Sequence, residues 1–268
     1  MDTQPVGPSD HCIRPDGAPV LHLFGGPYVT INGYRHEVPE GSKRLLAFVA
    51  LRRTRVERRH AAGTLWPFGD DGRAAGNLRS ALWRLRGAGI NVLDVDKWSL
   101  SLNPHVVVDV HLVTEWATRL VEGSSLGTDL TVSRSWREAL DLLPGWYDDW
   151  TLIERERLRQ RMLHALEALS RSLANVGRFA DSVEAAMVAV SAEPLRESAQ
   201  RALIDAHLAE GNFGEALRSY QAYRTLVRRE LGVDPSPDLT ALLHTAPFQR
   251  SRSRSAHPPA ARQKALTS

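Results

Sequence analysis

The segment Ala74–Arg86, AAGNLRSALWRLR, predicts a helix with two very different faces. At about 100° per residue, one stripe consists of small and aliphatic side chains, namely Ala75, Leu78, Ala81, Leu82 and Leu85. The opposite side and its flanks hold cationic and polar side chains and one tryptophan, namely Arg73, Asn77, Arg79, Ser80, Trp83 and Arg84. No acidic residue occurs between Arg73 and Arg86, so this face lacks the internal ion pairs of a typical solvated helix. Such a face suits a polyanion, although the segment alone is also compatible with an ordinary basic surface helix.

The length and composition of the chain indicate a soluble globular protein. Its 268 residues are enough for two modest domains, and 43% of them are hydrophobic and 24% charged. No apolar run approaches the roughly 18 to 20 residues of a membrane span, and the N-terminus has no apolar core of a secretory signal. The single cysteine, Cys12, excludes an internal disulfide and a cysteine-based zinc site. We therefore expect a cytoplasmic protein.

Charge is distributed unevenly along the chain. Residues 20–108 contain 13 basic and 7 acidic residues, whereas residues 109–246 contain 15 basic and 21 acidic residues. Residues 247–268 contain 5 basic residues and no acidic ones. This asymmetry favours a nucleic-acid-binding module followed by a module that binds protein.

The first half of the chain reads as a winged helix-turn-helix, residues 20–108, after a flexible leader, residues 1–19. Alternating segments from Val20 to Val38, with Asn32-Gly33 between two of them, predict a small antiparallel sheet. Ser42 is positioned to cap a first helix, and Glu57–Leu65 predicts a second. Two alternating segments around Asp96-Lys97 follow the basic helix and predict a hairpin. In such a fold the third helix enters the major groove and the hairpin lies against the adjacent backbone or minor groove.

The second half, residues 109–246, shows only helical periodicity, so the fold class is mainly α. The expected helices before the repeat described below are Asp109–Val121, Val132–Leu142 and Ile153–Val176. The pairs Gly177/Gly211 and Phe179/Phe213 reveal an internal repeat with an offset of 34 residues. This is the tetratricopeptide period, in which the glycine is expected to allow close approach at the turn. The basic, Ser/Pro-rich residues 247–268 predict a disordered tail.

Several motifs resemble one known family of regulators. The segments LHLFGGPYVTING, LLAFVAL, GTLWP, NLRSALWRLR and VVVDVHL follow one another as in the DNA-binding domain of Streptomyces antibiotic regulatory proteins (SARPs). The segments ALDLLPGWYDDW, ERERLRQRMLHALEAL and ELGVDPSPDL are similar to the bacterial transcriptional activation domain (BTAD) that accompanies it. The resemblance implies an OmpR-like winged helix, promoter binding, contact with RNA polymerase and dimer contacts through the helical domain. It also implies that the aromatic group around Trp150 is a packing anchor.

The recognition face and its surroundings give two groups of candidate DNA contacts. The side chains expected at base edges are Asn77, Arg79, Ser80, Trp83 and Arg84. The side chains expected at phosphates are Lys43, Arg44, Arg58, Arg59, Arg73, Arg86 and Lys97, the last at the hairpin tip. Trp98, beside Lys97, is compatible with either core packing or contact.

These observations predict a sequence-specific transcriptional regulator, most simply an activator, that binds double-stranded DNA and RNA polymerase and dimerises through its helical domain. We expect no cofactor, metal, membrane association or enzymatic activity, because no nucleophile–base pair, phosphate loop or metal-ligand spacing emerges. Two alternatives remain open. The chain could be a helical-repeat adaptor whose winged helix binds protein, or a repressor that uses the same DNA docking.

Overall fold

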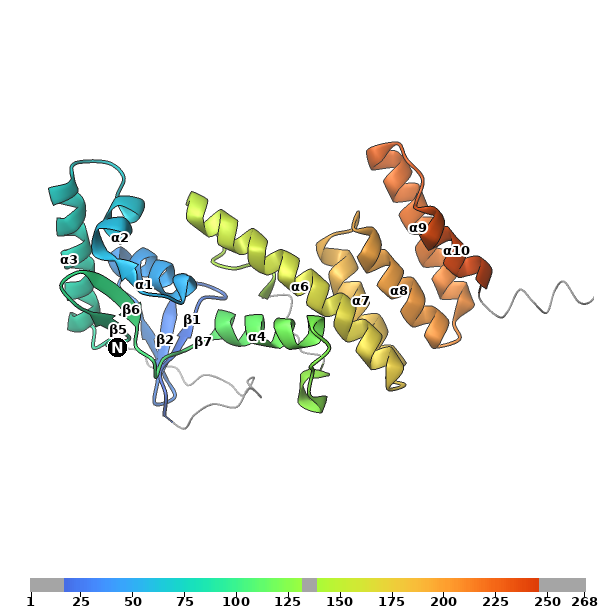
Figure 1. Cartoon of the computed structure of the whole chain (residues 1–268), viewed down its shortest axis with the longest axis horizontal. Coiled ribbons are helices and arrows are strands. Elements are labelled where there is room, and N and C mark those ends of the chain that lie inside the picture. The colour runs from blue at the N-terminus through green and yellow to red at the C-terminus, as the bar shows by residue number, and fades with distance from the viewer. Residues whose placement is uncertain (1–16, 132–138, 246–268) are drawn as a thin grey trace, which may run out of the picture. The chain divides into compact units, whose positions relative to one another are not determined.

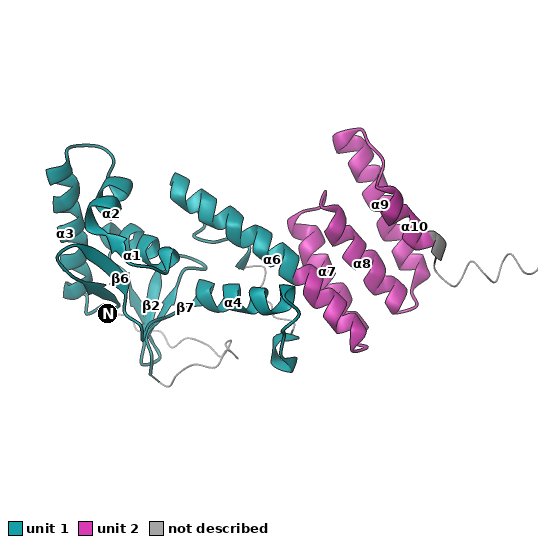
Figure 2. Ribbon diagram, viewed as in Figure 1, with its two compact units in different colours: residues 1–165 teal, residues 166–268 magenta. Residues whose placement is uncertain are grey.

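The structure, a computed structural model, describes residues 17–131 and 139–245. It divides into two compact units, Met1–Ala165 and Leu166–Ser268 (Figure 2). The predicted leader and tail, apart from residues 17–19, lie outside the described residues, as do residues 132–138 of the predicted helix Val132–Leu142.

Unit 1 opens with a four-stranded sheet in the order β3-β2-β1-β7. Its strands are β1 (Val20–His22), β2 (Tyr28–Ile31), β3 (Tyr34–Glu37) and β7 (Val107–Val108). The predicted turn at Asn32-Gly33 is present, and both residues have positive φ, 52° and 82°. β7 pairs with β1 in parallel, which the sequence patterns did not predict.

Three helices and a second sheet complete a winged helix-turn-helix, as predicted. The helices are α1 (Glu40–Arg52), α2 (Arg58–Leu65) and α3 (Asp71–Gly87). The strands β4 (Val56–Glu57), β5 (Leu93–Val95) and β6 (Ser99–Leu102) form a sheet in the order β4-β6-β5. The three helices pack on one another, and α1 also packs on β6 (Figure 1). The hairpin β5–β6, which follows the last of the three helices, is the wing.

Ser42 holds α1 against α3 and does not cap α1. The helix begins at Glu40, three residues earlier than the cap prediction implies, and its N-cap residue Pro39 makes no side-chain bond. Ser42 is fully buried, and its Oγ donates a 2.8 Å hydrogen bond to the carbonyl of Ala81 on α3. The prediction was wrong because a serine near a helix start can pair across the core instead of with its own backbone.

In the second part of unit 1, the start of α6 (Asp149–Asn175) packs on α1. Helix α4 (Asp109–Val121) has the predicted bounds and is followed by the short helix η1 (Gly127–Asp129). Helix α6 begins four residues before the predicted start. Trp150 is 8% exposed, and its ring packs edge-on against the ring of Phe48 of α1, with 5.3 Å between the ring centroids. Arg44 of α1 pairs with Asp148. The aromatic group thus anchors the start of α6 to the winged helix, although Tyr147 within it is 80% exposed.

Unit 2 contains the 34-residue repeat. After the C-terminal part of α6 come α7 (Phe179–Ala192), α8 (Glu197–Ala209), α9 (Phe213–Leu231) and α10 (Pro237–Thr245). The equivalent Gly177 and Gly211 have φ of 78° and 85°, and a Cβ at either position would meet nothing within 4 Å. The expectation of close approach at these glycines was therefore wrong. They are needed for a left-handed backbone conformation at the turn.

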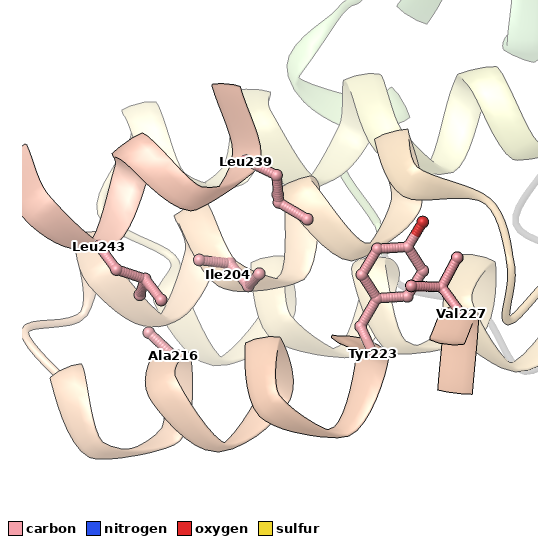
Figure 3. Close-up of a cluster of buried hydrophobic side chains, with 6 residues drawn as sticks. All are labelled: Ile204, Ala216, Tyr223, Val227, Leu239 and Leu243. Carbon is pink, nitrogen blue, oxygen red and sulfur yellow. The ribbon is translucent and has the colours of Figure 1, made fainter. Parts of the chain in front are cut away.

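The last three helices share a hydrophobic cluster (Figure 3). Ile204 of α8 lies between side chains of the two following helices, namely Ala216, Tyr223, Val227, Leu239 and Leu243. The connection from α9 to α10 is fixed by polar contacts. Gly232 caps α9 in the left-handed conformation, and the Glu197 carboxylate accepts a 3.0 Å hydrogen bond from the Ser236 N–H. These contacts give the ELGVDPSPDL segment a structural role in closing unit 2.

Replacing Ser42 by alanine should lower the free energy of unfolding by about 1–2 kcal/mol, because a buried hydrogen bond to the carbonyl of Ala81 is lost. Urea denaturation of the purified chain measures the difference. The control is Ser80→Ala, which changes an exposed position of α3 where alanine is the better helix former. An unfolding midpoint for Ser42→Ala equal to that of the wild type would contradict the assigned role.

Candidate nucleic-acid interface

Helix α3 is fixed at its start and along its buried stripe. The Asp70 side chain caps the helix by accepting a 2.7 Å hydrogen bond from the N–H of Arg73. The predicted stripe is buried at four positions, namely Leu78, Ala81, Leu82 and Leu85. The fifth, Ala75, is only partly buried, and the neighbouring Ala74 is buried in its place. The rotation of α3 about its axis therefore agrees closely with the prediction.

The face opposite that stripe is exposed and cationic. The exposed candidates on α3 are Arg73, Arg79, Ser80, Trp83, Arg84 and Arg86, whereas Asn77 is partly buried. Trp83 is 74% exposed, which is unusual for a side chain of its size. Within residues 17–131 and 139–245, no carboxylate forms an ion pair with any of the four arginines of α3. The charge of this face is therefore left for an external anion or solvent to balance.

The arginines of α6 are arranged differently. Arg157 pairs with Glu154 at 2.8 Å and Arg159 with Glu156 at 2.9 Å, both within the same helix. Arg155 donates to the carbonyls of Leu142, Leu143 and Trp146. In this second arginine-rich segment, Arg155, Arg157 and Arg159 therefore have acceptors within the chain, so arginine content alone does not single out α3.

Four of the five phosphate candidates outside α3 are already engaged within unit 1. On α1, Lys43 pairs with Glu40 at 2.8 Å, and Arg44 pairs with Asp148. On α2, Arg59 lies 3.3 Å from Asp71, and both side chains are more than 90% exposed. Arg58 Nη1 donates to the carbonyl of Asp96 in the wing at 3.1 Å. Exposed pairs of this kind contribute little and exchange readily, so Arg59 is more available to an anion than the part-buried Arg44.

The tip of the wing is a tight turn built around Asp96. Its carboxylate accepts hydrogen bonds from the N–H groups of Trp98 and Ser99, both at 2.7 Å, and from the Ser99 hydroxyl at 2.8 Å. The bond from the Trp98 N–H, followed by those from Ser99, lowers the pKa of Asp96 from its usual 3.8 to about 2. Asp96 therefore shapes the turn, although it is an acid close to the predicted DNA-facing surface.

The side chains next to Asp96 project from the turn. Lys97 places its Nζ 4.8 Å from the centre of the Trp98 ring, a cation–π arrangement, and Trp98 is 73% exposed. Of its two possible roles, the structure excludes core packing for Trp98. Arg55, which was not among the predicted site residues, lies 3.5 Å from Asp96. The only signal in the sequence that could have identified Arg55 as a site residue is its place in an arginine-dense segment.

Among residues 17–131 and 139–245, His, Cys, Asp and Glu side chains nowhere gather in a group of three or more that could hold a metal ion. In the same ranges, each helix is too short or too polar to cross a membrane.

The geometry defines a class of protein: a winged helix with an uncompensated arginine face, joined in one chain to a tetratricopeptide-like helical unit. The family described as "Bacterial transcriptional activator domain" matches residues 109–245, just over half of the chain. The chain therefore belongs to this family, as the resemblance to SARPs predicts. Its members are transcriptional regulators, which are not a class of enzyme.

Known relatives are similar over parts of their length. Regulatory protein AfsR of Streptomyces griseus is 37% identical over 105 residues, 39% of this chain and 10% of that protein. AfsR of Streptomyces coelicolor is 29% identical over 215 residues, 75% of this chain and 22% of that protein. The chain thus spans about a tenth to a fifth of the length of these relatives.

A solved structure has the same fold. Mycobacterium tuberculosis EmbR, in complex with a low-affinity phosphopeptide, superposes with a TM-score of 0.67 over 87% of this chain and 65% of that one. At 22% identity, the likeness concerns the fold alone.

Replacing Asp96 by alanine should loosen the wing tip without unfolding the winged helix, because three hydrogen bonds to one exposed carboxylate are lost together. Amide hydrogen exchange of Trp98 and Ser99 should accelerate. Asp94→Ala, two residues earlier on the exposed side of β5, is the matched control and should leave both amides protected. Equal exchange in the two variants would show that Asp96 does not hold the turn.

The same carboxylate gives a pH prediction. Because its pKa is lower in the folded protein, at about 2, than the usual 3.8, its stabilising contribution is complete above the unfolded value and is lost as pH falls through the folded value. The amide resonances of Trp98 and Ser99 should stay constant from neutral pH to about pH 4 and shift below it. A titration midpoint at or above the usual carboxyl value would contradict these hydrogen bonds.

Proposed function

We propose that this chain is a sequence-specific DNA-binding transcriptional activator whose helix α3 docks in the major groove. The observation that carries the proposal is the exposed face of α3, where four arginines have no carboxylate partner among the described residues. Asparagine, serine and tryptophan share that face, so it offers both charge and hydrogen bonds to DNA. Membership of a family of transcriptional regulators supports the same conclusion.

The proposed contacts fall into two groups. Base edges are contacted by Asn77, Arg79, Ser80, Trp83 and Arg84. Phosphates are contacted by Lys43, Arg44, Arg58, Arg59, Arg73, Arg86 and Lys97. Within the second group, Arg73 and Arg86 are ready for phosphate, whereas Lys43 and Arg44 would first give up their pairs with Glu40 and Asp148. The α3 arginines therefore supply most of the electrostatic contribution.

The helical region supplies protein contacts in this proposal. We assign residues 20–108 to the DNA-binding domain and residues 109–246 to a domain that contacts RNA polymerase and a second copy of the chain. The acidic balance of the second region and its match to an activator domain support this assignment. Two copies on neighbouring promoter repeats would place both helical domains beside the polymerase.

A selection from a random-sequence duplex library with the purified full chain tests DNA recognition directly. We expect one recurrent motif. Arg84→Ala should then weaken binding to that site by about 1–3 kcal/mol and relax the preference at one base position, as expected for a bidentate contact with guanine. Asn77→Ala should relax a different position. The control is Arg157→Ala, which removes an arginine already paired with Glu154 on α6.

Three outcomes separate the candidate functions. A recurrent motif that survives both substitutions would remove these residues from the readout. Salt-sensitive binding without a motif would indicate a non-specific DNA binder, and no binding would favour the protein-binding adaptor. Transcription in vitro from a promoter that carries the motif distinguishes an activator from a repressor.

Salt dependence tests the phosphate contacts separately. Each phosphate contact contributes about 0.9 to the slope of log affinity against log salt concentration. Arg86→Ala should therefore reduce the slope by about 0.9 without changing base preference, whereas Arg157→Ala should leave the slope unchanged. An unchanged slope for Arg86→Ala would exclude a phosphate contact at that residue.

A further inference from the structure

Gly41, in the first turn of α1, lies directly beneath the side chain of Arg84. A Cβ at this position would fall 2.7 Å from Arg84 Nη1, 3.3 Å from its Cζ and 3.8 Å from its Cδ. The first distance is far shorter than any normal contact, so the arginine occupies space that only a glycine leaves free. Among glycines in the described helices, Gly41 alone would bring a Cβ within 3 Å of another residue.

The backbone of Gly41 gives no other reason for a glycine. Its φ is not positive, and it sits in an exposed helical turn where alanine is the better helix former. The contact with Arg84 is therefore the feature of the structure that accounts for glycine here.

The contact belongs to a fixed crossing between two helices. Ser42, the next residue of α1, donates its buried hydrogen bond to the carbonyl of Ala81, three residues before Arg84 on α3. The spacing of the two helices at this point is thus set by a bond in the core. Gly41 then decides how closely the outward-pointing Arg84 can lie across α1.

No carboxylate among residues 17–131 and 139–245 pairs with Arg84, so no ion pair holds its guanidinium in place. The guanidinium charge is therefore uncompensated, and its position over α1 depends on the space that Gly41 leaves open.

We propose that Gly41 is a positioning residue that sets the DNA sequence preference of this protein through Arg84. The inference rests on the proposed function, in which Arg84 contacts a base. A methyl group at position 41 would exclude the present position of the guanidinium over α1 and leave Arg84 only rotamers that point elsewhere. The base preference due to Arg84 would weaken, although Gly41 itself touches no DNA.

The test compares two glycine-to-alanine variants of the full chain. Gly41→Ala adds a methyl group against Arg84, whereas Gly63→Ala adds the same group at an exposed position of α2 where nothing lies within 4 Å. Both changes favour the helix in the same way, and both variants should remain folded because the obstructing atom is the mobile end of a side chain. Thermal melting checks this directly.

The first measurement needs no DNA. In the free protein, the Nε–Hε resonance of Arg84, assigned by its absence in Arg84→Ala, reports the surroundings of the side chain. Its shift and relaxation should change in Gly41→Ala and stay unchanged in Gly63→Ala. A resonance unaffected by Gly41→Ala would overturn the inference, even if the protein binds DNA specifically.

The second measurement uses the selected operator and its single-base variants. Gly41→Ala should reduce discrimination about 3- to 10-fold at the base position affected by Arg84→Ala, and on the Arg84→Ala background it should change affinity less than about 2-fold. Independent, multiplying effects of the two substitutions, or an equal loss on every operator variant, would also overturn the inference. A wild-type protein without sequence preference would refute both the proposed function and the effect on recognition, and the resonance measurement would then show whether Gly41 still determines the position of Arg84.

Discussion

The orientation of α3 depends on the buried hydrogen bond from Ser42 to the carbonyl of Ala81. A hydroxyl in the core must find a partner, and this carbonyl lies on the buried stripe of α3. Turning α3 by one residue, about 100°, would bring arginines toward the core, where an unpaired charge costs several kcal/mol. One polar contact and one apolar stripe thus select the same rotation, and the arginines are left outside as a consequence.

Charge compensation distinguishes the two arginine-rich helices. Elsewhere in the described chain, arginines commonly face an acid three residues away, as Arg178 faces Asp181 and Arg218 faces Glu215. Helix α3 has acids only at its start, where Asp70 is used as a cap. No acid occurs in the sequence between Arg73 and Arg86, so α3 itself cannot neutralise its exposed face beyond the first turn. In the wing, the carboxylate of Asp96 is used locally in the same way as that of Asp70, because it accepts hydrogen bonds from N–H groups of its own turn.

Much of the fold could be predicted from the sequence because its signals are local. Apolar periodicity placed the buried stripe of α3, Asn32-Gly33 marked a turn with two positive φ angles, and the 34-residue offset is reproduced by the starts of α7 and α9. The contacts that the sequence did not reveal join residues far apart in the chain. Nothing near Ser42 points to Ala81, and nothing near Arg44 points to Asp148, 104 residues later. The candidate surface was therefore predictable as a face, but the partners of its surrounding cations were not.

The glycines show why some features could be predicted from the sequence and others could not. At Gly177 and Gly211 the sequence suggests close approach, yet the space is open and the backbone conformation is what requires glycine. At Gly41 the backbone conformation is ordinary and the close approach is real, because the Arg84 side chain occupies the position of a Cβ. A repeat can reveal that a glycine matters, but the reason depends on either a dihedral angle or a distant side chain. The repeat does not tell which of the two applies, and the contact between Gly41 and Arg84 emerges only from the packing of α1 on α3.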